Sequence, residues 1–168
     1  MIIGLKGGKF WQEGKAVSVL FRRDMKVLIY NGADKEYAEK CMSDFNRIKK
    51  DVLNKLCRAA ILYCYDSLNS WAEIDKRDDI EKAMKVQLTP DLPPEKILKC
   101  LVPKIMSVRH SEDDRIGYQI EFDCDWEPDK GMEIVMLGGE LIYLGTFMDN
   151  SPWDTFPEND PQNYVNKL

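Results

Sequence analysis

Hydrophobic and polar positions alternate most regularly in the second half of the chain, between residues 116 and 124. Ile116, Tyr118, Ile120, Phe122 and Cys124 are apolar, and polar residues or glycine stand between them. A period of two is typical of a strand, here with one buried and one solvated face. Two further strands are predicted over 132–137 and 140–145. Gly138-Gly139 joins them, because glycine accepts the positive φ of a two-residue turn. We therefore predict a three-strand meander.

The N-terminal part of the chain predicts a hairpin. Residues 16–21 and 25–30 are rich in β-formers and are separated by the polar stretch Arg22-Arg23-Asp24, which favours antiparallel pairing. Residues 1–15 are predicted to be a flexible lead. Their glycines precede Lys9 without the G-x-x-x-x-G-K-S/T spacing of a phosphate-binding loop.

Helical periodicity dominates the middle of the chain. Asp34 is predicted to cap a helix over 35–48, and Asp51 to cap a second helix after a joint at residues 49–51. A short helix is expected near Trp71–Ile80, a further helix over 95–102 that Pro103 ends, and a strand over 105–108. Residues 147–168 contain three prolines and predict an irregular C-terminal wrap.

These elements predict one α+β domain over residues 1–168. We expect an antiparallel sheet, made of the N-terminal hairpin and the C-terminal three-strand meander, packed against two or three central helices.

Charge and composition narrow the function classes. The net charge of −5 weighs against nucleic-acid binding, which needs clusters of Lys and Arg. The longest apolar stretch, 59–65, is much shorter than the roughly 20 residues of a spanning helix, so no membrane contact is expected. No signal peptide is recognised. The five cysteines have no C-x-x-C spacing and are expected to be reduced and buried, in a cytoplasmic protein.

Catalytic signatures are scarce. His110 is the only histidine and lies in a charged stretch, Arg109 to Asp114, without a nucleophile motif. One histidine and scattered cysteines offer no zinc spacing. We assign no catalytic residue, no metal ligand and no cofactor.

One acidic segment carries more information. Asp123, Asp125, Glu127 and Asp129 occupy every second position before Gly131. The spacing fails as an EF-hand, since the sixth residue is Pro128 and the twelfth is Ile134. The carboxylates either bind a cation loosely or decorate a strand and its turn. Trp126 is interpreted as a core or rim anchor.

Three motifs resemble an uncharacterised bacterial family, a domain of unknown function. They are Tyr37-Ala38-Glu39-Lys40-Cys41, Cys124-Asp125-Trp126-Glu127-Pro128 and Tyr143-Leu144-Gly145. The resemblance covers about residues 17–145. Members of that family read Glu-His-Gly where this chain has Asp129-Lys130-Gly131, so the histidine of that turn is missing here. At the level of class, small acidic α+β proteins also resemble immunity proteins of toxin systems.

The leading hypothesis is a non-enzymatic protein-binding domain, immunity-like in a bacterial toxin system, with a basic protein as its partner. Its expected binding residues are Asp125, Trp126, Glu127, Asp129 and Trp153. The alternative is an enzyme or a divalent-metal module that uses the carboxylates from Asp123 to Glu133.

Overall fold

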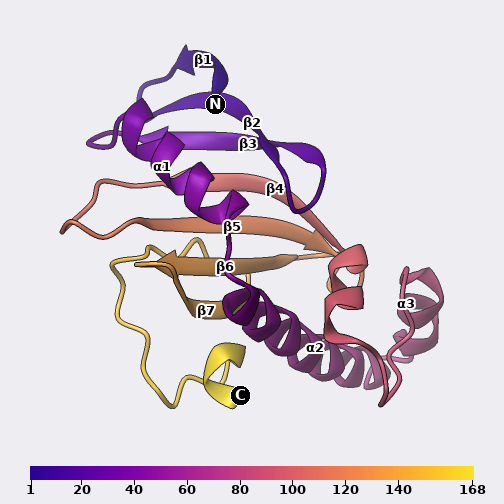
Figure 1. Ribbon diagram of the computed structural model, residues 1–168. Coiled ribbons are helices and arrows are strands. Elements are labelled where there is room, and N and C mark those ends of the chain that lie inside the picture. Colours follow the sequence, from indigo (N-terminus) through magenta and orange to yellow (C-terminus); the bar gives the residue numbers. More distant parts are fainter.

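A computed structural model describes residues 1–168 and contains one seven-stranded sheet with the strands in chain order (Figure 1). The strands are β1 (Ile3–Gly7), β2 (Trp11–Ser18), β3 (Arg23–Tyr30), β4 (Leu101–Val108), β5 (Gly117–Cys124), β6 (Met132–Leu137) and β7 (Glu140–Thr146). All neighbours pair antiparallel except β3 and β4, which are parallel. The α+β class and the largely antiparallel sheet are as the sequence predicts.

The single parallel pair explains where the helices lie. A parallel connection needs a crossover, and the segment between β3 and β4 carries α1 (Lys35–Asn46), α2 (Lys50–Ala72), α3 (Arg77–Ala83) and the 3₁₀ helix η1 (Pro94–Cys100). In Figure 1, α1 crosses in front of the sheet and α2 lies beside its lower strands. A second 3₁₀ helix, η2 (Tyr164–Lys167), ends the chain.

The helix boundaries differ in detail from the prediction. Asp34 caps α1 by accepting a hydrogen bond from the Tyr37 amide at 2.7 Å, as expected. Asp51, however, lies in the first turn of α2, and Lys49 occupies the cap position without a side-chain bond. Helix α1 ends at Asn46 rather than at residue 48, and α2 begins at Lys50. Asp51 therefore lies inside the first turn of α2, where its negative charge interacts favourably with the helix dipole instead of capping a backbone amide.

Pro103 was expected to end a helix, and this was wrong. Residues 94–100 form η1, and β4 already begins at Leu101, so Pro103 lies within a strand. The β4–β5 register shifts between Pro103 and Ile105. Proline is tolerated at such an irregularity because the ladder hydrogen bond is already interrupted there.

The flexible lead was also wrong. Residues 3–7 form β1 and residues 11–18 form β2, and Ile2 is buried in the core. The sequence hid these strands because the outer one is short and largely exposed, so little apolar alternation marks it.

The helices and the sheet share one hydrophobic core. Phe45 of α1 packs edge-on against Tyr118 of β5, and Tyr63 of α2 packs edge-on against Trp126. Alternate residues of the strands, such as Val27, Met106 and Ile120, point toward the helices and are fully buried. This face of the sheet therefore fixes the fold.

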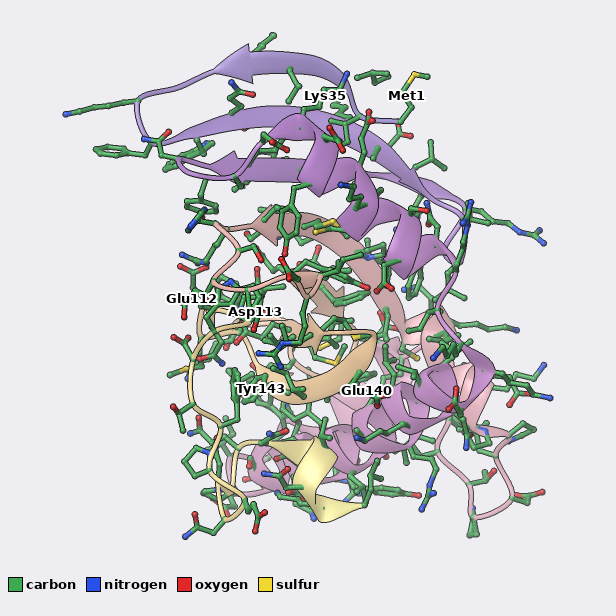
Figure 2. All side chains as sticks on the ribbon, turned by 60° about the vertical axis from the view of Figure 1, so that its left-hand side comes forward. Met1, Lys35, Glu112, Asp113, Glu140 and Tyr143 are labelled. Carbon is green, nitrogen blue, oxygen red and sulfur yellow. The ribbon has the colours of Figure 1, made fainter.

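The opposite face is divided in two. We call residues 147–163 the C-terminal strap, and it covers this face over β5, β6 and β7. Pro152 and Trp153 lie on Gly117, where an added Cβ would be 2.8 Å from the Pro152 Cβ. In Figure 2 the yellow C-terminal chain runs beside the lower strands, near Tyr143, and does not reach the upper strands β1, β2 and β3, and the helix in front of those upper strands is α1. The polar side of β5 was predicted to be wet, yet Gln119 is buried beneath the strap.

Candidate interaction surface

The predicted acidic turn is largely occupied by internal contacts. The Asp125 carboxylate accepts hydrogen bonds from the backbone amide of Lys85 at 2.9 Å and from its Nζ at 2.8 Å. Trp126 is 0% exposed, and its carbonyl accepts a hydrogen bond from the indole of Trp71 at 2.8 Å. Trp126 therefore belongs to the core and cannot contact a partner in this conformation.

The remaining predicted binding residues do not form one surface. Glu127 is half-buried and Asp129 is exposed in the turn after β5. Trp153 lies on the strap against Gly117, at the start of that strand, so the length of β5 separates it from the turn. No group of three or more His, Cys, Asp or Glu side chains is arranged to hold a metal ion. The metal-module alternative thus gains no support from the geometry.

Glu133 is the most unusual charged group of the molecule. Its side chain is 0% exposed and lies beneath the strap. It accepts hydrogen bonds from Gln119 Nε2 at 2.8 Å, Asn150 Nδ2 at 2.6 Å, and the backbone amides of Asp149 and Asn150 at 3.1 and 3.4 Å. No cationic side chain pairs with it. This carboxylate fastens the strap to the sheet.

Burial raises the pKa of Glu133, although the hydrogen bonds from Gln119 and Asn150 act in the opposite direction. Glu121 lies directly opposite on β5, so two carboxylates are cross-strand neighbours. Lys104 approaches Glu121 at 3.6 Å and offsets part of this repulsion. Two opposed carboxylates are electrostatically unfavourable, and the hydrogen bonds from the strap and Gln119 to Glu133, together with the Lys104–Glu121 contact, offset this cost.

No reactive thiol is present. All five cysteines are free and buried. Burial raises the pKa of Cys41 and of Cys57 to about 12, and that of Cys100 to about 11. At neutral pH these groups are protonated thiols, which are poor nucleophiles.

Three aromatic side chains form a cluster on the half of the face that the strap leaves open. Trp11 of β2 pairs with Tyr30 of β3, and their ring centroids are 5.8 Å apart. Phe10 lies 6.3 Å from Trp11, and the Arg109 guanidinium stacks 4.6 Å from the Tyr30 ring. Phe10 and Trp11 are exposed. Arg109 also pairs with Asp149 of the strap at 2.7 Å, so the cluster adjoins the covered half.

Further residues of this region follow from the strand register. Gly14, Ala16, Val27 and Ile29 face the core, so their sequence neighbours point to the open side. A hollow of about 300 Å³ lies between β1 and β2. We call this region the open face and define it as Ile3, Lys6, Lys9, Phe10, Trp11, Glu13, Lys15, Val17, Asp24, Lys26, Leu28 and Tyr30.

The open face is basic although the chain is acidic. It holds four lysines against two carboxylates, whereas the whole protein has a net charge of −5. Glu13 pairs with Lys26 at 3.4 Å, and Lys6, Lys9 and Lys15 have no ion-pair partner. Lys15 lies directly opposite Lys26. Lysine and aromatic side chains are thus gathered on one sheet surface.

The sequence could not locate this surface. Trp11 lay in the segment expected to be a flexible lead, and the register that aligns it with Tyr30 was not predicted. The alternation of residues 11–18 around Gly14 and Ala16 is a signal in retrospect, but two small buried residues mark a core face only weakly.

The structure defines this chain as an α+β sheet protein that has helices on one face of the sheet and a half-covered opposite face. The chain belongs to the family described as "Domain of unknown function (DUF6985)", whose match spans residues 3–151. The expected membership of an uncharacterised domain family is therefore confirmed. No curated protein and no solved structure matches the chain. No helix has the length and apolar character needed to cross a membrane.

Proposed function

We propose that this protein is a non-enzymatic protein-binding domain and that the open face is its binding surface. The observation that carries the proposal is the cluster of the exposed Phe10 and Trp11 with the half-buried Tyr30, on a sheet face whose other half is covered by the chain's own strap. Tryptophan, tyrosine and arginine are the residues most enriched at interface hot spots. Apolar surface gathered in this way marks a contact site.

The chemistry of the remaining molecule supports a non-enzymatic role. A hollow of about 970 Å³ is bordered by Lys50, Asp51, Asn54 and Glu95 beside the Cys57 thiol. It has no histidine, and Cys57 stays protonated at neutral pH because burial raises its pKa to about 12. His110 is exposed, and its Nδ1 lies 2.8 Å from the Gly32 carbonyl oxygen. In neither place is a nucleophile hydrogen-bonded to a general base, because the Cys57 thiol has no hydrogen-bond partner and His110 contacts a backbone carbonyl.

Photo-crosslinking tests the proposal. A photoreactive amino acid replaces Val17, which is 55% exposed on the open face, or Ile74, which is 57% exposed in the α2–α3 connection. In the native host we expect a discrete protein adduct at position 17 that an excess of unmodified protein suppresses. The matched position 74 should give no such adduct. The same adducts at both positions, or none at position 17, would contradict the proposal.

An immunity-like role is a narrower form of the proposal, in which the bound partner is a bacterial toxin. The basic partner expected from the sequence would use Glu127 and Asp129, which have no ion-pair partner, unlike Asp125. Converting both to lysine should leave the adduct at position 17 unchanged if the open face is the binding surface. Loss of that adduct would instead favour the acidic turn.

A further inference from the structure

We propose that the partner of the open face is an acidic protein segment, which places carboxylates on the Lys15–Lys26 pair and an apolar side chain on the Trp11–Tyr30 cluster. This inference rests on the function proposed above and names the chemistry of the partner. It differs from the sequence-based expectation of a basic partner because it follows from the charges of a surface that the sequence did not reveal.

Each half of the face contains one pair of like-charged side chains on adjacent strands. On the covered half, Glu121 and Glu133 lie directly opposite each other on β5 and β6. On the open half, Lys15 and Lys26 lie directly opposite each other on β2 and β3. Like charges in directly opposed positions destabilise a sheet.

The Glu121–Glu133 pair shows how the chain offsets the repulsion between opposed like charges. The strap supplies Glu133 with three hydrogen-bond donors, and Gln119 adds a fourth. In the lysine pair, Lys26 contacts the Glu13 carboxylate at 3.4 Å, whereas Lys15 has no ion-pair partner. A carboxylate bound from outside would supply Lys15 with the opposite charge that the chain places only beside Lys26.

A second copy of the chain fits this face poorly. A two-fold contact between open faces would bring two surfaces together that each hold four lysines and two carboxylates. Such like-charge juxtaposition opposes association. Charge complementarity therefore selects a partner of opposite sign.

The edge of the sheet is a weaker candidate than its face. β1 is an edge strand, but it has only five residues, contains Lys6, and shifts its register between Ile3 and Lys6, where Gly4 has a φ of +67°. Short length, lysine and a bulge are the features by which edge strands resist pairing. The partner segment is thus expected to lie across the open face rather than to extend the sheet.

Nuclear magnetic resonance titration of the full chain tests the inference with defined probes. The probes are a peptide of glutamate, leucine and tryptophan, the same peptide with glutamine for glutamate, the same peptide with lysine for glutamate, and oligothymidylate. We expect the glutamate peptide to bind most tightly, with the largest amide shift changes in β2 and β3. Added salt should weaken this binding.

Two charge reversals on the protein sharpen the test. Lys15→Glu with Lys26→Glu should weaken binding of the glutamate peptide by about tenfold or more. The matched control reverses two exposed lysines elsewhere, Lys49→Glu with Lys82→Glu, and should leave the affinity within about twofold. Far-ultraviolet circular dichroism confirms that both double variants are folded.

Several outcomes would overturn the inference. They are equal affinity for the three peptides, binding of none of them, equal effects of the two double variants, or tighter binding of oligothymidylate on the same strands. If the cross-linked adduct forms at position 17 but peptide binding does not depend on charge, the acidic partner is refuted and the proposed function stands. If the adduct at position 17 and the charge-dependent peptide binding are both absent, the proposed function is refuted as well.

Discussion

The two halves of the helix-free sheet face differ in what completes them. Over β5 to β7 the chain covers its own strands with the strap, and Glu133, Gln119 and Val135 are buried there. Over β1 to β3 nothing covers the strands, and Trp11 and Val17 remain exposed. The same sheet thus has one half that the strap covers and one half that leaves aromatic side chains exposed and three lysines without an ion-pair partner. The covered half therefore stabilises the fold, and the open half is the surface proposed for binding.

Two tryptophans provide the largest test of this difference. Trp126→Ala empties a fully buried site and should lower the free energy of unfolding by about 3–5 kcal/mol. Trp11 is 39% exposed, and Trp11→Ala should cost less than about 1 kcal/mol while removing the cross-linked adduct. Chemical denaturation measures both losses. Comparable losses for the two variants would mean that the open face also belongs to the core.

Glu133 tests whether the strap is fastened as described. Glu133→Ala leaves four donors without their acceptor and should cost about 3 kcal/mol, since each buried unsatisfied donor costs about 1–3 kcal/mol and water compensates in part. Faster amide hydrogen exchange at Asp149 and Asn150 should accompany the loss. Glu121→Ala removes the opposed carboxylate and should cost less than about 1 kcal/mol, because Glu121 has only the salt bridge with Lys104. An equal loss in both variants would contradict the fastening role of Glu133.

The pH dependence of stability gives a smaller signal from the same group. Because burial raises the pKa of Glu133, the folded state holds this proton more tightly than the unfolded state. The resulting stabilisation is complete below the ordinary glutamate pKa of about 4.3 and is lost as the pH rises through the raised value. Relative to Glu133→Gln, the wild type should therefore become less stable across that window. Unfolding curves at several pH values measure the difference, and parallel profiles would exclude Glu133 as its source. Glu121, Tyr143 and Asp149 are the other ionisable groups near it and are present in both proteins.

The lysine pair provides the smallest test. Lys15→Glu places opposite charges across β2 and β3 and should raise the free energy of unfolding by about 0.5 kcal/mol. Lys82→Glu on α3 makes the same change of net charge away from the sheet and serves as the control. An equal change in both variants would show that net charge, rather than the opposed lysines, sets the effect. Lys15→Glu should also bind the glutamate peptide less tightly. The substitution would then stabilise the fold and weaken binding at the same time.

Much of the C-terminal sheet could be predicted from sequence because its signals are local. The alternation over 116–124 predicted β5, and Gly138-Gly139 predicted a turn, where the two φ values are +61° and +81°. The β1 strand could not be predicted, since a short exposed edge strand owes its conformation to pairing with β2. Pro103 misled the prediction because a bulge in β4 tolerates the missing donor.

The candidate site shows the same limit. Acidic residues at every second position drew attention to the turn after β5, but the structure ties Asp125 to Lys85 and buries Trp126. The open face depends on Trp11 meeting Tyr30, and on Lys15 meeting Lys26, across two strands. Cross-strand neighbours are set by register, which periodicity along one strand does not report.

The sequence by itself determined the α+β class, the existence of most helices and strands, and the absence of a recognisable catalytic motif, because periodicity, turn chemistry and composition are properties of short segments. Only the tertiary structure decided which polar residues are buried and which aromatic residues are exposed. Glu133 is buried because the strap returns to the sheet, and Trp11 is exposed because the strap ends its path over β5 to β7. Glu133 is hydrogen-bonded to residues 14 to 17 positions away along the chain, and the exposure of Trp11 follows from the path of the strap, so neither outcome leaves a local pattern in the chain.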